Sequence, residues 1–213
     1  MHLLELINYC SLNNIIKIML LNNYHNKKTN INFIETNEKF LKEIYNKKII
    51  TTNKIIDNWN NKLFNMNHMY KLQELVCKDS LINQNGIKKL SNIIKLNCHN
   101  NEHIYNVNHL TKLKKLNTML FSTVNQEGIR KLTKIKILKC YDHKNITNVN
   151  HMKNLKGLHI QGYDCGINQK GIIKLTGINV LNAYTNNKIT NISHIKNLKI
   201  YNYQSTKYLK KKY

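Results

Sequence analysis

The feature of this sequence that most constrains its fold is a histidine-marked motif that recurs at a nearly fixed interval. The stretch ITNVNHMKNLKGLHI begins at Ile146, and related stretches begin at Leu63, Ile104 and Ile189. Its apolar residues return at every third position, a period that fits neither an amphipathic helix nor a half-buried strand. The marker histidines are separated by 41, 42 and 43 residues, and they are His68, His109, His151 and His194. Such a repeat indicates an array of stacked units.

A second unit type lies between the copies of the first. INQNGIKKLSNIIKLNC begins at Ile82, VNQEGIRKLTKIKILKC at Val124 and INQKGIIKLTGINVLNA at Ile167. Aligning both types on their apolar positions gives one frame of roughly 21 residues, repeated seven times between about Leu63 and Tyr203. Each unit ends in L-x-x-L-x-L or a close variant, with apolar positions at Leu72, Leu75, Cys77; Ile93, Leu96, Cys98; Leu113, Leu116, Thr118; Ile135, Leu138, Cys140; Leu155, Leu158, Ile160; Ile178, Leu181, Ala183; and Leu198, Tyr201, Tyr203.

This pattern resembles the leucine-rich repeat family, whose units of about 20 to 29 residues read L-x-x-L-x-L-x-x-N/C-x-L. The resemblance covers residues 63–204 and implies an α/β fold, a solenoid with a parallel concave sheet of about seven short strands. One unit cannot cover its apolar side alone, but stacked units align these positions into continuous ladders. The asparagine ladder of the family implies turn positions for Asn101, His143 and Asn186.

The strict alternation of the two unit types predicts return segments of two shapes. The histidine-marked type is expected to return in a short 3₁₀-like turn, and the second type is expected to form about two helical turns. Gly86, Gly128 and Gly171 share one position in the second type. We expect them to mark a tight bend, where glycine is favoured.

Residues 1–62 lack the repeat, and two interpretations stay open for them. The helical apolar spacing from Leu3 to Asn23 predicts short helices that form an N-terminal cap over the open end of the solenoid. The stretches YCSLNNIIKIMLLN and FLKEIYNKKI also resemble a degenerate F-box, a helical module that docks onto the Skp1 adaptor of a ubiquitin ligase. That resemblance implies an adaptor that recruits substrates to a Skp1-cullin ligase. Residues 205–213 are expected to form a basic tail.

The charge of the chain has two explanations. Its 34 basic and 11 acidic residues give a net charge of +23, which favours an anionic partner. Alternatively, the charge reflects coding bias, because Lys, Asn and Ile have A/T-rich codons and the chain has no proline. This composition and repeat style resemble the leucine-rich repeat proteins, with or without an F-box, of giant DNA viruses that infect amoebae.

Several classes of protein are disfavoured by what the sequence lacks. It has no apolar run long enough to span a membrane and no secretory signal, so we expect an intracellular, monomeric protein. The five cysteines have no close pairs, and consecutive marker histidines are expected roughly 10 Å apart, too far to share a zinc ion. We expect buried core positions for Cys77, Cys98 and Cys140 and an exposed loop position for Cys165. No catalytic or phosphate-binding motif is found, so neither an enzyme nor a cofactor is expected.

The candidate site is the concave face of the predicted sheet, where the residues between the apolar positions point away from the core. We expect it to bind a protein partner with an acidic segment, through lysines that supply long-range attraction and tyrosines that supply contact area. Lysine bias at exposed positions is the competing explanation, and nucleic acid is the alternative partner. The candidate residues are Lys95, His99, Lys114, Lys115, Lys136, Lys139, Tyr141, Lys156, His159, Tyr184 and Lys199.

Overall fold

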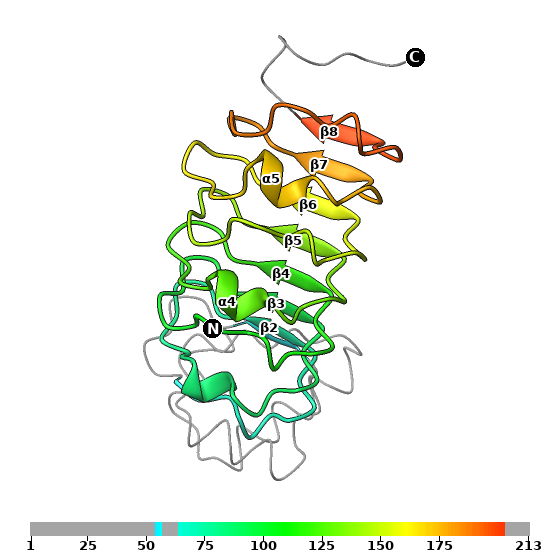
Figure 1. Ribbon diagram of the computed structural model, residues 1–213. Helices are drawn as coiled ribbons and strands as arrows, with labels where there is room; N and C mark the ends of the chain where they lie inside the picture. The colour runs from blue at the N-terminus through cyan, green and yellow to red at the C-terminus, as the bar shows by residue number, and fades with distance from the viewer. Residues whose placement is uncertain (1–53, 57–63, 203–213) are drawn as a thin grey trace, which may run out of the picture.

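Each repeat unit contributes one three-residue strand to a continuous parallel sheet (Figure 1). The computed structural model describes residues 54–56 and 64–202. Strands pair in sequence order, so each coil of the solenoid lies against the one before it. The eight strands are β1 (Lys54–Ile56), β2 (Glu74–Val76), β3 (Lys95–Asn97), β4 (Lys115–Asn117), β5 (Ile137–Lys139), β6 (Gly157–His159), β7 (Val180–Asn182) and β8 (Ile200–Asn202).

The strands β2 to β8 coincide with the seven predicted units, but β1 lies before them. It pairs with β2 and falls in the segment 1–62, for which we expected a helical cap. That expectation is wrong for residues 54–56, where the β-branched Ile55 and Ile56 favour a strand. The rest of the expected cap, both F-box-like stretches and the tail 205–213 lie outside the described residues.

The core is a stack of ladders formed by the apolar positions of the repeat. The central ladder pairs Leu75 with Leu96 and Leu96 with Leu116, and it continues through Leu138, Leu158 and Leu181. Each of these side chains is at most 2% exposed, and full burial of a leucine stabilises the fold by about 1.5–3 kcal/mol. All L-x-x-L-x-L positions of the first six units are buried, including Cys77, Cys98 and Cys140 as predicted.

The second unit type returns through a single helical turn. These turns are the 3₁₀ helix η1 (Asn85–Ile87) and the α-helices α4 (Gln126–Ile129) and α5 (Gln169–Ile172). The side chains of Asn125 and Asn168 cap α4 and α5 by accepting a hydrogen bond from a backbone N–H in the turn. The expected two turns were too long. A helical residue advances only about 1.5 Å, so a longer helix would leave too few extended residues to complete the coil.

The repeated glycines are required by contact between coils. Gly86, Gly128 and Gly171 are buried in these helical turns, and none has a positive φ. A Cβ atom on Gly128 would overlap the carbonyl oxygen of Tyr105, and one on Gly86 would overlap that of Phe64. The glycines lie in tight turns of the chain as predicted, but glycine is needed there because it lets two backbones approach. The approach allows the N–H of Val107 to donate to the carbonyl of Gly128 at 2.9 Å.

The histidine-marked type returns without a regular helix, through short turns as predicted. In one unit the N–H of Leu110 donates to the carbonyl of Val107 at 3.0 Å, and the N–H of Leu113 donates to that of Leu110 at 2.9 Å. These i to i−3 bonds are the 3₁₀ pattern. The side chain of Asn108 ties this turn to the next coil, since its Nδ2 donates to Glu127 O and its Oδ1 accepts from Lys131 N.

Candidate binding surface

The outward side of the sheet, which we call the strand face, carries two columns of side chains from the first and third residues of each strand. The strand register aligns the first column as Glu74, Lys95, Lys115, Ile137, Gly157 and Val180. The second column is Val76, Asn97, Asn117, Lys139, His159 and Asn182. The middle residues of β2 to β7 are buried in the core, so these two columns form the outward side of the sheet.

The structure distributes the predicted site residues over three zones. Lys95 and Lys115 lie in the first column, and Lys139 and His159 lie in the second. Four lysines directly precede a strand, and three residues lie two positions beyond a strand end. The first group is Lys114, Lys136, Lys156 and Lys199, and the second is His99, Tyr141 and Tyr184. Strands β4 to β6 bring five lysines together, whereas Lys199 and Tyr184 belong to β8 and β7.

Three of these lysines form an unbroken column. The N–H of Lys136 donates to the carbonyl of Lys114, and the N–H of Lys156 donates to that of Lys136, both at 2.8 Å. All three residues are exposed. Adjacent strands are about 4.8 Å apart, so the column places like charges on neighbouring strands, which is unfavourable without an anion.

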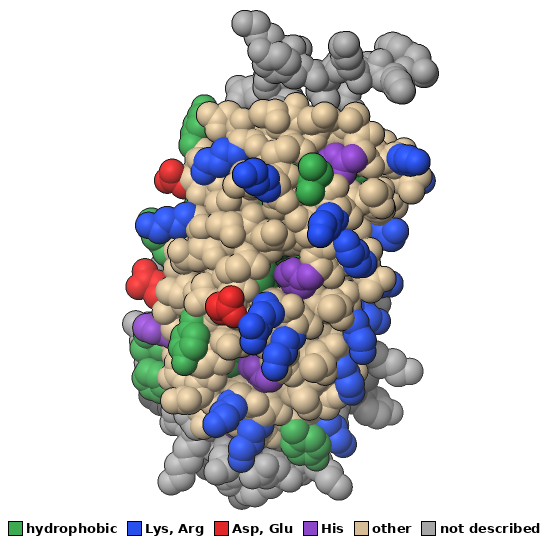
Figure 2. Space-filling model, in the orientation of Figure 1, with side chains coloured by type: hydrophobic (Ala, Val, Ile, Leu, Met, Phe, Trp, Pro, Cys, Tyr) green, Lys and Arg blue, Asp and Glu red, His purple; other side chains and the backbone are tan. Residues whose placement is uncertain are grey.

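Acidic side chains neutralise little of this surface. Three ion pairs are found within residues 64–202, and one of them, Lys95 to Glu74 at 2.9 Å, lies on the strand face. No ion pair in that range involves Lys114, Lys115, Lys136 or Lys139. Figure 2 shows the same imbalance, with many Lys and Arg side chains and few Asp and Glu on the visible face. Within residues 64–202, the lysine charge at β4 to β6 is therefore not neutralised by acidic side chains.

The pKa values of both histidines of the candidate site are lowered by their surroundings. His159 is partly buried beside Lys139, and burial and the lysine charge lower its pKa. Burial, together with the charge of Lys78, also lowers the pKa of His99. The positive charge of this surface therefore comes mainly from its lysines.

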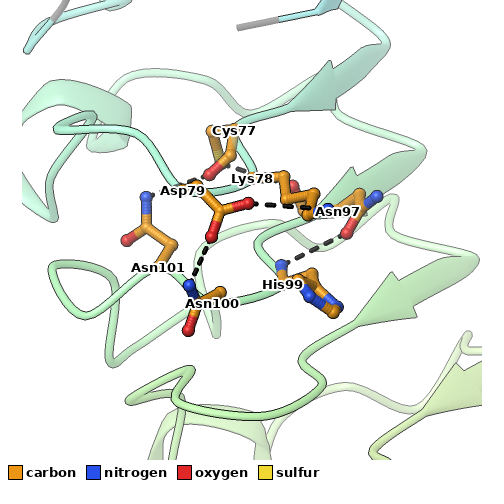
Figure 3. Close-up of polar contacts among 7 residues, drawn as sticks. All are labelled: Cys77, Lys78, Asp79, Asn97, His99, Asn100 and Asn101. Carbon is orange, nitrogen blue, oxygen red and sulfur yellow. Dashed lines mark hydrogen bonds and ion pairs between the residues drawn. The ribbon is translucent and has the colours of Figure 1, made fainter. Parts of the chain in front are cut away.

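The turns after the strands form a fixed border to the strand face (Figure 3). Asp79 and Asn100 occupy equivalent positions with left-handed φ angles of 52° and 53°, and their side chains are hydrogen-bonded to each other. The N–H of His99 donates to the Oδ1 of Asn97 at 3.2 Å, which closes the turn after β3. The next position is the buried Asn101, whose Nδ2 donates to the carbonyl of Cys77 at 3.1 Å.

The predicted asparagine-ladder positions are all buried, but their hydrogen bonding differs. Asn101 also donates to the carbonyls of Ser80 and Ile82, and its Oδ1 accepts from two backbone N–H groups. Asn186 makes three similar bonds. Neither ring nitrogen of His143 makes a hydrogen bond of good geometry, and burial lowers the pKa of this imidazole, an effect that the nearby backbone of Ser122 partly offsets. The ladder is thus complete at two positions and interrupted at His143.

The residues that sequence reasoning missed lie in two longer turns at this border. Phe121 and Tyr163 are 70% and 69% exposed, and they follow β4 and β6. Their turns contain one and two residues more than the turn between Cys98 and Asn101. In the sequence these residues can be recognised as insertions, because their units are longer at this point than the unit that contains Cys98 and Asn101.

Other features of the described residues bear on chemistry. Cys165 is fully buried, and its Sγ donates to the carbonyl of Cys140 at 3.5 Å, so the expected exposure was wrong. The turn before Cys165 has two residues more than the turn before Asn101, which makes it look like an open loop in the sequence. In the structure Cys165 nevertheless occupies the buried turn position that Asn101 occupies in its own unit. Burial raises the pKa of Cys98 to about 12, which keeps it a thiol.

No three His, Cys, Asp or Glu side chains within the described ranges could hold a metal ion. No described helix is long and apolar enough to cross a membrane.

A stack of one-strand coils with leucine ladders defines a leucine-rich-repeat-like solenoid, and a comparison with solved structures agrees. The crystal structure of internalin C2 from Listeria monocytogenes matches with a TM-score of 0.51 and 19% sequence identity, over 70% of this chain and 69% of that chain. At this identity the likeness concerns the fold alone. No protein-family model matches the chain. No curated protein matches it significantly.

Proposed function

We propose that this protein is a non-enzymatic interaction module that binds an acidic segment of a protein partner on its strand face. The observation that carries the proposal is the cluster of lysines on β4 to β6 that have no acidic partner within residues 64–202. A sheet that places like charges side by side stores repulsion, and an incoming row of carboxylates relieves it. The exposed chains of Lys114, Lys115, Lys136, Lys139 and Lys156 can follow such a segment across three coils.

The chemistry of the surface suits recognition better than catalysis. Lysines on an open face accelerate encounter and select for acidic partners, while adding little affinity each. The thiols of Cys77, Cys98, Cys140 and Cys165 are all buried in the core. None of these four thiols takes part in the proposed function. Specificity comes from the arrangement of charge and of neighbouring apolar side chains.

A charge-reversal experiment tests the proposal. The variant Lys115→Glu, Lys136→Glu, Lys139→Glu should lose a partner captured from an amoebal lysate and identified by mass spectrometry, with an unchanged circular dichroism spectrum. The matched control is Lys131→Glu, Lys134→Glu, Lys153→Glu, which changes three exposed lysines of the return segments by the same charge. Retention of the partner by the control alone supports the proposal. Retention by both variants contradicts it.

The segment before the repeats offers a second function. Residues 1–62 resemble an F-box, so the chain would act as a substrate adaptor inside an amoebal host cell, as the likeness to giant-virus proteins implies. This predicts that Skp1 is recovered from an amoebal lysate by the full chain and lost when residues 1–62 are deleted. A deletion variant that still binds Skp1, or a full chain that does not, contradicts the adaptor function.

Nucleic acid is the third candidate, because the chain carries a net charge of +23. Phosphate binding by lysines weakens steeply as salt rises. A titration with duplex and single-stranded DNA at two salt concentrations should show that slope, and an absence of binding at low salt removes this alternative. Arginine, which makes most bidentate contacts to phosphate and guanine, occurs once, at Arg130.

A further inference from the structure

Aromatic side chains line one edge of the strand face on four consecutive coils. They come from the turns that follow β4, β5, β6 and β7, and they are Phe121, Tyr141, Tyr163 and Tyr184. Phe121, Tyr163 and Tyr184 are 70%, 69% and 41% exposed, and Tyr141 is partly exposed. We call these four residues the aromatic rim.

The two most exposed members of the rim, Phe121 and Tyr163, owe their exposure to extra residues in the turns after β4 and β6. Three steps lead from Cys98 to the buried Asn101, and three lead from Cys140 to the buried His143. Four steps lead from Thr118 to the buried Ser122. The additional residue cannot be accommodated in the core, so Phe121 is displaced into solvent. The same reasoning applies to Tyr163, where the turn is one residue longer still.

Backbone hydrogen bonds hold these turns in place. The N–H of Leu120 donates to the carbonyl of Tyr141 at 3.0 Å, and the N–H of Gly162 donates to that of Tyr184 at 2.9 Å. Leu120 and Gly162 have left-handed φ angles of 55° and 104°. For a leucine this conformation is uncommon and persists only where the surroundings fix it. The rim is thus built on turns ordered before any partner arrives, which lowers the entropy cost of binding.

The rim is continuous with the lysines of the strand face. Lys139 and Tyr141 are separated only by Cys140, which points into the core, so both lie on the outward side. The same spacing relates Asn182 to Tyr184. A partner that covers the lysines of β4 to β6 therefore reaches the rim without leaving the surface.

The charge around the rim differs from that of the strands. Asp142 lies between Tyr141 and Tyr163 along the chain, and Asp164 follows Tyr163 directly. The side chain of Asp142 accepts a hydrogen bond from the backbone N–H of Asp164 at 3.3 Å, so the Asp142 carboxylate lies against the turn that carries Tyr163. Carboxylates among the aromatics repel phosphates and peptide carboxylates alike, so the part of a partner that lies over the rim must be uncharged. A peptide can place apolar side chains there and its carboxylates over the lysines, whereas a nucleic acid carries a phosphate at every nucleotide.

We propose that the rim and the lysines form one composite surface, which takes an acidic segment that also carries aromatic or large aliphatic side chains. The carboxylates of the segment lie over β4 to β6, and its apolar side chains pack against Phe121 and Tyr163. This proposal rests on the function proposed above and specifies the class of partner. Aromatic anchors beside charged residues are the composition in which binding energy concentrates. Isolated exposed aromatics, such as Tyr105 in a return segment, carry no such meaning.

Two labelled peptides separate the contributions of the two zones. One is a short peptide of Glu and Ser, and the other is the same peptide with several Ser replaced by Phe. The full-length chain should bind the Phe-containing peptide at least about tenfold more tightly. The rim variant Phe121→Ser, Tyr163→Ser should bind both peptides with equal affinity. The control variant Tyr105→Ser, Ile173→Ser changes two exposed apolar residues elsewhere and should keep the preference.

The outcomes distinguish this inference from the proposed function. Equal binding of both peptides by the wild-type chain overturns the rim, as does a preference that the rim variant retains. If the Lys115→Glu, Lys136→Glu, Lys139→Glu variant still loses the Glu and Ser peptide in those cases, the acidic-segment function stands without the rim. If no peptide binds, both proposals fail. An oligothymidylate that binds more tightly than either peptide, and loses affinity in the rim variant, also overturns the peptide assignment.

Discussion

The Nε2 of His109 lies 3.0 Å from the carbonyl oxygen of Ile87 in the preceding coil. Because a carbonyl only accepts, this ring nitrogen carries a proton and donates it. His151 and Ile129 repeat the contact at 3.0 Å, as do His194 and Ile172 at 3.2 Å. At these three positions the marker histidine is therefore a hydrogen-bonding clamp between coils.

Replacing this clamp should weaken the stack. We expect His109→Ala to lower the free energy of unfolding by about 1 kcal/mol, the usual net value of one hydrogen bond. The control is His103→Ala, at an exposed imidazole for which the change should lie within about 0.5 kcal/mol. Urea denaturation followed by circular dichroism measures both. Equal stabilities of the two variants would count against the clamp.

The glycines of the second unit type give a sharper contrast. A Cβ on Gly128 would overlap the carbonyl of Tyr105, whereas one on Gly157 would meet Ile137 Cγ1 at an ordinary 3.6 Å. Backbone atoms cannot step aside easily, so Gly128→Ala should cost about 3 kcal/mol or prevent folding. Gly157→Ala should be neutral or slightly stabilising, because alanine restricts the unfolded chain.

Thermal denaturation of the two alanine variants checks this contrast. A Gly128→Ala protein with the wild-type melting temperature would show that the coils can separate at this contact. The double variant Gly86→Ala, Gly171→Ala tests whether the requirement recurs at the equivalent positions, where a Cβ also meets backbone.

These two features show how far the sequence reached. The leucine positions, the strand positions and the burial of Cys77 follow from periodicity, because each unit repeats the same inward residues. The period locates His109 and Gly128 but does not assign their roles, since both roles depend on atoms about 22 residues away that become neighbours only in the stack. The burial of turn residues such as Cys165 was hardest to predict, because inserted residues in these turns break the regular spacing of the repeat.

Substitutions at the buried turn position, which Asn101 and His143 occupy in their units, should change the free energy of unfolding in opposite directions. Asn101→Ala would leave three backbone carbonyls and two N–H groups without their partner, so we expect a loss of about 3 kcal/mol or more. At the equivalent position, His143→Asn would supply an amide where neither ring nitrogen makes a hydrogen bond of good geometry, and we expect a gain of about 1 kcal/mol. Asn145→Ala, at an exposed side chain, is the control. Chemical denaturation that ranks His143→Asn below the wild type would contradict the ladder.

The pH dependence of stability should follow the buried histidines. Burial lowers the pKa of His109, His143 and His159 below the value of about 6.5 that applies in the unfolded chain. Below that pH the unfolded chain binds more protons than the folded chain, so stability is full above about pH 6.5 and falls as pH drops toward the folded pKa values.

The variant His143→Asn isolates one part of this effect. Its free energy of unfolding should fall less between pH 7.5 and pH 5 than that of the wild-type chain, because one buried imidazole no longer resists protonation. Urea midpoints at the two pH values provide the comparison. An identical decrease in both proteins would mean that His143 is protonated freely in the folded state.

The strand face is tested most directly by lysine footprinting. The chain is acetylated alone and with the Phe-containing acidic peptide, and the modification of each lysine is quantified by mass spectrometry. We predict protection of Lys114, Lys115, Lys136, Lys139 and Lys156, with no change at the exposed return-segment lysines Lys131, Lys134 and Lys153. Protection of the return segments, or equal modification of every lysine with and without bound peptide, would contradict binding on the strand face.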